Sequence, residues 1–479
     1  MAKKQLLHEF PLHGLFTRIW TIWFSLAGLF RVFTSTWWLF DQETNNRLIP
    51  IEMWFTLACL AFGVLYLFFL AFAWKDTWSK VWRTFKSSLT WSRVLLGLLF
   101  LWYVIDCLIV GNLQGGNWLR ANDSPLYDGF VCFFILYALG QIWKDHEKVL
   151  RYTLYGYTAA VSIFMIYALI NVFSLHIFSI PNGQVGMDEN VTLCLACNAN
   201  ITGLFCAIWC MLCLWVVLTE NKLWLRIPFG VFSVFQFVAV ALSGSRACYL
   251  SLAFVLTVGV FMVFWNKLTD KPLARRIPFS ALPAAVAGVL LFFFLKEWIY
   301  ALFEAFTHFA ELLGLDMATQ VEFKNGLSGR ENIWKATLDI LTRNRQFGFF
   351  GVTPISVPSL IALGMNSEEV LVANTHNEFL EMWAALGFPG FALYVGWLVS
   401  VAVDCIRVGL AKEDRLGRGV WCLPLIVLAC IMINMMEARL LFNNYFIGEA
   451  FFLVCGMVAV YAEKLKKAPL SRKGAKKRR

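Results

Sequence analysis

Stretches of about twenty apolar residues recur along the whole chain and constrain its fold more than any other feature. A segment that crosses the hydrocarbon core of a bilayer is helical because its backbone polar groups must be satisfied internally, and it needs about twenty such residues to span the thickness of the core. The stretches lie near residues 19–40, 51–73, 94–111, 126–143, 153–175, 191–218, 225–242, 247–265, 277–295, 379–405, 420–438 and 442–461. The sequence therefore predicts an all-α polytopic membrane protein of about twelve transmembrane helices.

The composition agrees with lipid as the main solvent of the protein. Hydrophobic residues make up 59% of the 479 residues and charged residues only 15%, which leaves little polar surface for water. All 13 cysteines fall in apolar stretches, and the CxxC of Cys194 and Cys197 has no second ligand pair beside it. We therefore expect neither a disulfide framework nor a metal site.

Positive charge is distributed unevenly over the loops between the apolar stretches. Lys and Arg gather near residues 75–86, 144–151, 222–226, 267–276 and 407–418 and in the tail 464–479. The alternate short loops contain only Arg47, Arg120, Arg246 and Arg439. Because positive loops stay in the cytoplasm, both termini are expected there. This rule also accounts for the net charge of +10, so no nucleic-acid partner is expected.

The connection between the ninth and tenth apolar stretches, residues 296–378, is much longer than the others and is expected outside the cytoplasm. Connections of such length usually carry function. Within it, Glu297 to Leu313 has the apolar spacing of an interfacial helix, and Ser328 and Glu331 have the spacing of a capping box. The chain then divides into helices 1–9 (residues 1–295), an outer loop with amphipathic helices (296–378), helices 10–12 (379–461) and a basic cytoplasmic tail (462–479).

His376 is the candidate catalytic base. Of the six histidines, His176, His308 and His376 fall on the outer side in this topology. Thr375 and Glu378 have capping-box spacing, which predicts that His376 lies in the first turn of a helix. The positive end of the helix dipole would keep the imidazole neutral and able to accept a proton. The alternative is that His376 is a polar residue at the membrane interface without a chemical role.

Two arginines on the same predicted side could bind an anion. Arg246 lies in a very short turn after Ser-Gly-Ser, and Arg330 lies at the start of the capped loop helix, where free backbone amides already favour anions. A guanidinium contacts two phosphate oxygens at once, so both are candidate ligands of a diphosphate. The alternative for Arg330 is a solvated ion pair with Glu331 or Glu322.

Several further polar residues are candidates for supporting roles. They are Asn374, Asn377 and Glu378 around His376, and Glu437 and Arg439 at the last outer turn, where pairing between the two is expected. Within the apolar stretches, Arg31 and Asp106 are the clearest ionisable residues at membrane depth, and a mutual ion pair would give them a structural role.

These residues resemble the motifs of the O-antigen ligases and the related polymerases. The matching pieces are Ser-Gly-Ser-Arg ending at Arg246, Ser-Gly-Arg-Glu followed by Trp334, and Asn-Thr-His-Asn-Glu followed by Ala-Leu-Gly-Phe-Pro-Gly up to Gly390. Their order, their spacing and their predicted membrane side agree with that family. The resemblance also extends to the span count and the late position of the long loop, and it is firmest over residues 195–460.

The resemblance implies a GT-C-like glycosyltransferase of the bacterial inner membrane that needs no metal or other cofactor. Such an enzyme takes a glycan from undecaprenyl diphosphate on the periplasmic face and transfers it to the lipid A–core oligosaccharide of lipopolysaccharide. The resemblance assigns His376 to activation of the acceptor hydroxyl and Arg246 and Arg330 to the diphosphate. Attack opposite this leaving group would invert the anomeric centre.

Four alternatives remain. A repeat-unit polymerase or a protein O-oligosaccharyltransferase would have the same fold and another acceptor. A lipid-linked glycan flippase would suit twelve spans, but transporters tend to place ionisable groups at the midplane of repeated halves. A purely structural membrane protein would not need His and Arg residues clustered on one side.

Overall fold

The computed structural model describes residues 90–113, 146–172, 186–187, 193–194, 199–243, 245–312, 330–365, 374–411, 416–438 and 446–467, with isolated residues between 15 and 79. The elements, in chain order, are α4 (Trp91–Leu113), α6 (His146–Val172), β1 (Gly186–Met187), β2 (Leu193–Cys194), α7 (Ala199–Thr219), α8 (Leu223–Leu242), α9 (Arg246–Lys267), α10 (Leu273–Leu312), α11 (Arg330–Arg343), α12 (Arg345–Phe350), η4 (Pro354–Ser356), α13 (Val357–Met365), α14 (Glu378–Gly409), α16 (Cys422–Asn434) and α17 (Phe446–Lys467). The described part is thus helical apart from one short antiparallel ladder between β1 and β2.

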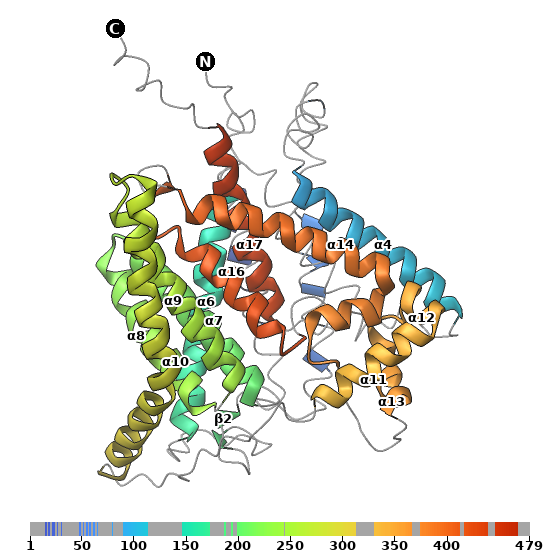
Figure 1. Ribbon diagram of the computed structural model, residues 1–479, viewed down its shortest axis with the longest axis horizontal. Helices are drawn as coiled ribbons and strands as arrows, with labels where there is room; N and C mark the ends of the chain where they lie inside the picture. The colour runs from blue at the N-terminus through green and yellow to red at the C-terminus, as the bar shows by residue number, and fades with distance from the viewer. Residues whose placement is uncertain are drawn as a thin grey trace.

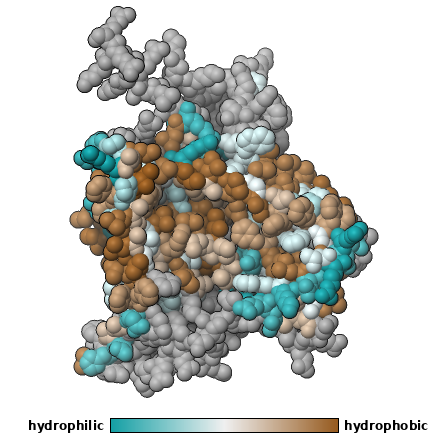
Figure 2. Space-filling view, viewed as in Figure 1, coloured by the Kyte–Doolittle hydropathy of each residue, from teal (hydrophilic) through white to brown (hydrophobic). Residues whose placement is uncertain are grey.

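Among the described helices, 6 are long and apolar enough to cross a membrane. These segments are Trp91–Val110, Thr202–Thr219, Leu223–Val240, Ala247–Lys267, Leu273–Leu291 and Glu378–Gly409. Figure 2 shows a broad apolar belt over these helices, with hydrophilic residues toward the ends of the molecule. By helix length and composition, the chain is a multi-pass membrane protein. The count of twelve spans stays a prediction. The stretches 126–143 and most of 19–40 and 51–73 lie outside the described residues. Helices α6, α16 and α17, which form on 153–175, 420–438 and 442–461, are described but are not among the six.

Helices α10 and α7 differ most from their predicted bounds. The stretch 277–295 and the expected interfacial segment form the single 40-residue helix α10, about 60 Å long at 1.5 Å per residue. No glycine or proline occurs between Gly288 and Leu312 to interrupt it. The predicted stretch 191–218 instead begins with the ladder that pairs Gly186 with Cys194, and α7 starts only at Ala199.

Helix α14 lies against α4 along one side of the molecule, and buried aromatic residues join it to α17 (Figure 1). Trp397 of α14 stacks on Phe452 of α17 with ring centroids 5.4 Å apart, and Tyr394 packs on the same indole at 6.0 Å. All three side chains are almost fully buried. This packing holds α14 in place, and α14 begins at Glu378, two residues after His376.

Helix α14 is bent at Gly387, where the backbone has a φ of 65°. Glycine adopts this conformation readily, and a Cβ here would also overlap the carbonyl oxygen of Phe349. Pro389 follows two residues later and has no N–H to donate to the carbonyl of Ala385. Carbonyl groups at the bend therefore lack their usual helical partners.

The segment that follows α12 docks onto α14 through these open carbonyls. The backbone N–H groups of Val352 and Thr353 donate to the carbonyls of Ala384 and Ala385 at 2.9 and 3.0 Å. The indole of Trp102 on α4 donates to a third carbonyl at 2.8 Å. Figure 1 shows α11, α12 and α13 packed below the bent part of α14. The bend thus positions α11, which begins with Arg330, beside the start of α14.

Candidate functional site

The buried carboxylate of Glu437 joins two segments that are far apart in the sequence. Its Oε1 accepts a hydrogen bond from Nη2 of Arg330 at 2.5 Å, and its Oε2 lies 3.1 Å from Nδ1 of His376. The Glu437 side chain is 1% exposed, whereas those of Arg330 and His376 are 11% and 23% exposed. A buried carboxylate with two partners is therefore covered by two groups that still reach the surface.

The backbone just before Glu437 holds the same two segments. Nη1 of Arg330 donates to the carbonyl of Met436 at 2.6 Å, and Nδ2 of Asn377 donates to the carbonyl of Met435 at 2.9 Å. These residues directly follow α16. The turn after α16 therefore acts as a bridge between the first residue of α11 and the turn that carries His376.

The turn that carries His376 is held in an unusual conformation. His376 has a φ of 51°, which is uncommon for a residue with a Cβ. Its backbone N–H donates to Oδ1 of Asn374 at 2.9 Å, and both the N–H and the hydroxyl of Thr375 lie 2.8 Å from Oε2 of Glu381. The indole of Trp334 on α11 donates to the carbonyl of Thr375 at 2.9 Å. Such strain persists only where the surroundings enforce it, and it is frequent at functional sites.

The predicted place of His376 in the first helical turn is wrong. Helix α14 begins at Glu378, and its N-cap is Asn377, whose side chain accepts the N–H of Leu380 at 3.0 Å. Thr375 does not cap the helix, because its hydroxyl is engaged by Glu381. The His376 ring is therefore not held by the first turn of α14. It is held by its contact with the carboxylate of Glu437.

This geometry determines which nitrogen of His376 can accept a proton. An ionised carboxylate has no hydrogen to donate, so Nδ1 must be the donor in its contact with Glu437. In the neutral imidazole, Nε2 then carries the lone pair. Arg330 compensates the charge of Glu437 on its other oxygen. The arrangement can therefore present a hydrogen-bond acceptor, Nε2, beside a fixed positive charge.

Asn374 offers a further polar atom next to this group. The residue is fully buried, and its Oδ1 is used by the His376 turn. Its Nδ2 has no hydrogen-bond partner within the part of the chain that the structure describes. An amide N–H without a partner is costly when buried, so a ligand oxygen would be favourable there.

The start of α9 lies near the same place. Cys248, two residues after Arg246, is within electrostatic range of both Glu437 and Arg330. Ser243 and Ser245 before it are buried against Gly203 of α7. Arg246 is the first residue of α9, so its backbone emerges at this end of the molecule. Its side chain lies outside what the structure describes.

The remaining predicted residues have the following places. Glu378 is buried in the first turn of α14, and His308 is exposed on α10. Asp106 is fully buried on α4 and neither carboxylate oxygen has a described partner. Arg31, Arg439 and His176 lie outside the described residues, so the predicted pairs of Arg31 with Asp106 and of Arg439 with Glu437 stay predictions.

Glu381 and Trp334 were not predicted to support the site. Their signal in the sequence was weak: Glu381 is an acidic residue at the start of an apolar span, and Trp334 lies on the apolar face of the loop helix. The pairing of Arg330 with Glu437 was not predicted either, because 107 residues separate them. The predicted alternative partner Glu331 is exposed, whereas Glu437 is buried.

A comparison with protein families identifies a domain in this chain. Residues 229–395 match the family model described as O-antigen ligase. The chain carries an O-antigen ligase domain. The matched stretch contains Arg246, Arg330 and His376, while Glu437 lies beyond its end. No curated protein matches the chain. The O-antigen ligase family consists of glycosyltransferase-type membrane enzymes that transfer lipid-linked glycans.

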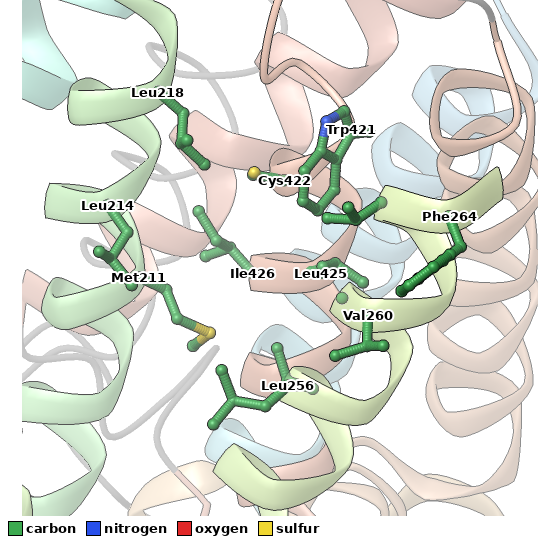
Figure 3. A pocket seen from close by; sticks show the side chains of 13 residues that line it. Met211, Leu214, Leu218, Leu256, Val260, Phe264, Trp421, Cys422, Leu425 and Ile426 are labelled. Atoms are coloured by element: carbon green, nitrogen blue, oxygen red, sulfur yellow. The ribbon is translucent and has the colours of Figure 1, made fainter. Parts of the chain in front are cut away.

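The O-antigen ligase domain also borders an apolar pocket of about 320 Å³ between α7, α9 and α16 (Figure 3), and Glu437 is not part of its lining. Its lining includes Met211, Leu214 and Leu218 of α7, Leu256, Val260 and Phe264 of α9, and Cys422, Leu425 and Ile426 of α16 with the N-cap residue Trp421. None of these described side chains is charged, so the pocket does not suit a diphosphate. The polar residues around Glu437 remain the candidate active site.

Proposed function

We propose that this protein is a lipopolysaccharide ligase, which transfers a glycan from undecaprenyl diphosphate to the lipid A–core oligosaccharide. The observation that carries the assignment of residues is the contact of Glu437 with both His376 and Arg330. A base and an anion ligand held by the same carboxylate can act together at one anomeric carbon, the base on the acceptor and the anion ligand on the leaving group.

His376 is the general base in this scheme. Nε2 accepts the proton of the acceptor hydroxyl while the acceptor oxygen attacks the anomeric carbon of the donor sugar. The bond between that carbon and the diphosphate oxygen breaks, and the electron pair leaves with the diphosphate. Glu437 stays ionised and stabilises the imidazolium that forms, as a carboxylate does behind the histidine of other catalytic groups.

Arg330 and Arg246 bind the diphosphate of the donor. A guanidinium has five N–H donors, and the described contacts of Arg330 to Glu437 and Met436 use one N–H on each terminal nitrogen. The other donors can contact phosphate oxygens as charge develops on the leaving group. Arginine in this role needs no metal ion. Nδ2 of Asn374 is suited to a hydroxyl or phosphate oxygen of the same complex.

The topology that suits this reaction has both termini in the cytoplasm of the bacterial inner membrane and the active site on the periplasmic face. The distribution of Lys and Arg over the loops supports it. The residues around Glu437 lie at the start of α14 and the end of α16, whereas α17 ends at the other end of the molecule with Lys467 (Figure 1).

The experiment uses the purified chain in vesicles with undecaprenyl-diphosphate glycan and lipid A–core. His376→Ala should reduce transfer by about 10²-fold or more, as loss of a general base does, while donor binding persists. His308→Ala is the matched control, because His308 is an exposed histidine of α10. Full transfer by His376→Ala, or loss of transfer in both variants, contradicts the proposal.

A polymerase or a protein O-oligosaccharyltransferase would use the same groups with another acceptor. Deleting the gene separates the first of these from the ligase. Loss of a ligase leaves lipid A–core without O-antigen, whereas loss of a polymerase leaves core that carries one repeat unit. A flippase would continue to move donor lipid when His376 is replaced.

A further inference from the structure

A polar cavity lies at the end of α14 opposite the candidate active site. It has a volume of about 500 Å³ and is lined by Arg276 of α10, Arg407 of α14, Leu410 and Ala411 directly after α14, and Ala462, Leu465 and Lys466 of α17. Three cationic side chains from three helices thus border one cavity. None of them takes part in the proposed transfer reaction.

Arg276 is positioned with unused hydrogen-bonding capacity. Its guanidinium stacks on the ring of Trp265 at 3.8 Å, and its Nε donates to the carbonyl of the same residue at 2.9 Å. Its Nη2 is buried and has no partner among the described residues. Two contacts therefore fix the plane of the guanidinium, and the side chain, which lines the cavity, retains N–H donors for an anion.

The positive charge of the cavity is only partly compensated. Arg407 pairs with Asp404 at 3.1 Å, and Lys466 is an exposed residue within electrostatic range of the same carboxylate. Glu463, the other acidic residue in that range, is bonded to Arg93. The described groups therefore leave more positive than negative charge around the cavity, which favours an anionic ligand.

The rest of the surroundings is apolar. Leu410, Ala411, Ala462 and Leu465 form the uncharged part of the lining. The adjoining first turns of α10 expose Leu273, Ile277 and Phe279, and the window Leu273–Leu291 has the composition of a membrane span. A basic pocket beside a lipid-facing helix can take a phosphate and the chains attached to it together.

We propose that this cavity binds the phosphate of an anionic phospholipid headgroup, with the acyl chains along the exposed face of α10. The charge distribution of the loops places the cavity in the cytoplasmic leaflet, where basic side chains at helix ends contact anionic lipid. Such a lipid bridges the ends of α10, α14 and α17. It stabilises the same helix, α14, that begins at the His376 turn.

Binding is measured on the full chain in nanodiscs of phosphatidylcholine with increasing phosphatidylglycerol, and by native mass spectrometry of retained lipid. Wild-type protein should retain phosphatidylglycerol in preference to phosphatidylcholine. Arg276→Gln and Lys466→Gln should each weaken that retention about 5-fold or more, because each removes a phosphate contact worth about 1 kcal/mol. Arg275→Gln is the matched control, since Arg275 is the exposed neighbour that does not line the cavity.

Two results would overturn the proposal. One is equal retention of phosphatidylglycerol by wild type and by the Arg276→Gln, Lys466→Gln double variant. The other is displacement of the lipid by inorganic phosphate at millimolar concentration, which would mean a site for a soluble anion. Lys466→Gln keeps the test valid if loss of the Arg276 stacking impairs folding, because Lys466 is exposed at the end of α17.

Discussion

The Nδ1 of His376 lies 3.1 Å from the buried carboxylate of Glu437, which is 61 residues further along the chain. The same carboxylate pairs with Arg330, the first residue of α11. A single acidic residue therefore controls the orientation of the proposed base and the position of a proposed diphosphate ligand. Its replacement should affect both, and the two effects can be measured separately.

Glu437→Gln should lower kcat about 10²-fold with a smaller change in KM. The amide cannot stabilise the imidazolium, and its NH₂ group can donate to Nδ1 and so favour the wrong tautomer. Glu437→Asp should restore part of the rate, and the pH dependence of kcat should shift in Glu437→Gln. Glu331→Gln, on the exposed side of α11, is the control. An unchanged pH profile would mean that Glu437 has only a structural role.

Arg330→Lys should weaken donor binding about 10-fold although the charge is kept. Lysine lacks the planar fork with which Arg330 contacts Glu437 and the carbonyl of Met436 simultaneously. Binding is measured with undecaprenyl diphosphate in detergent. Arg343→Lys at the other end of α11 is the control, because its side chain is 81% exposed. Equal affinity of Arg330→Lys and wild type would contradict a role of Arg330 in binding the donor.

The sequence predicts the helices of this protein better than it predicts the contacts between them. Long apolar stretches predict α4, α8, α9 and α14 because lipid requires helices of about that length and composition. Local capping chemistry is less decisive. Thr375 and Asn377 are both residue types that commonly cap a helix. Asn377 is the N-cap of α14, because the hydroxyl of Thr375 donates to the buried Glu381 instead.

The partners at the candidate site depend on tertiary structure that no local pattern encodes. Arg330 was expected to contact a neighbour or a ligand, and its partner is 107 residues away. The bend at Gly387 makes this pairing possible, because the carbonyls it frees hold the segment after α12. Gly and Pro in an apolar span indicate a bend, but they do not identify the segment that will fill it.

Gly387→Ala should destabilise the protein strongly. The new Cβ would overlap the carbonyl of Phe349, and alanine at a positive φ adds strain, so a loss of about 3 kcal/mol is expected. Gly396→Ala is a control on the same helix, because a Cβ added there would lie 3.8 Å from the nearest side-chain atom, in ordinary van der Waals contact. Thermal unfolding in detergent is the measurement. Equal stability of the two variants would contradict the described bend.

Stability should fall in acid through Glu147 at the start of α6. Burial alone would raise the pKa of this carboxyl. Hydrogen bonds from Lys464 and Tyr461, together with the charges of Lys464 and Arg151, lower the pKa by more than burial raises it, so the pKa is below its ordinary value. A lowered pKa contributes stability above the pKa of the unfolded chain, and this contribution is lost as pH falls through the folded value. Glu147→Gln should be less stable than wild type at pH 7 and should approach it in acid. A stability difference that is independent of pH would contradict this.

The reaction should invert the anomeric configuration. Retention would need a carboxylate that forms a covalent glycosyl intermediate, with a second group to release it. Among the described carboxylates of the site, Glu437 is 1% exposed and has both oxygens engaged by Arg330 and His376. Glu381 is bonded to Thr375, and Glu378 is buried. Direct attack by the acceptor oxygen, deprotonated at His376 and opposite the diphosphate, is therefore the expected route. The coupling constant of the anomeric proton, measured by NMR on donor and product, distinguishes inversion from retention.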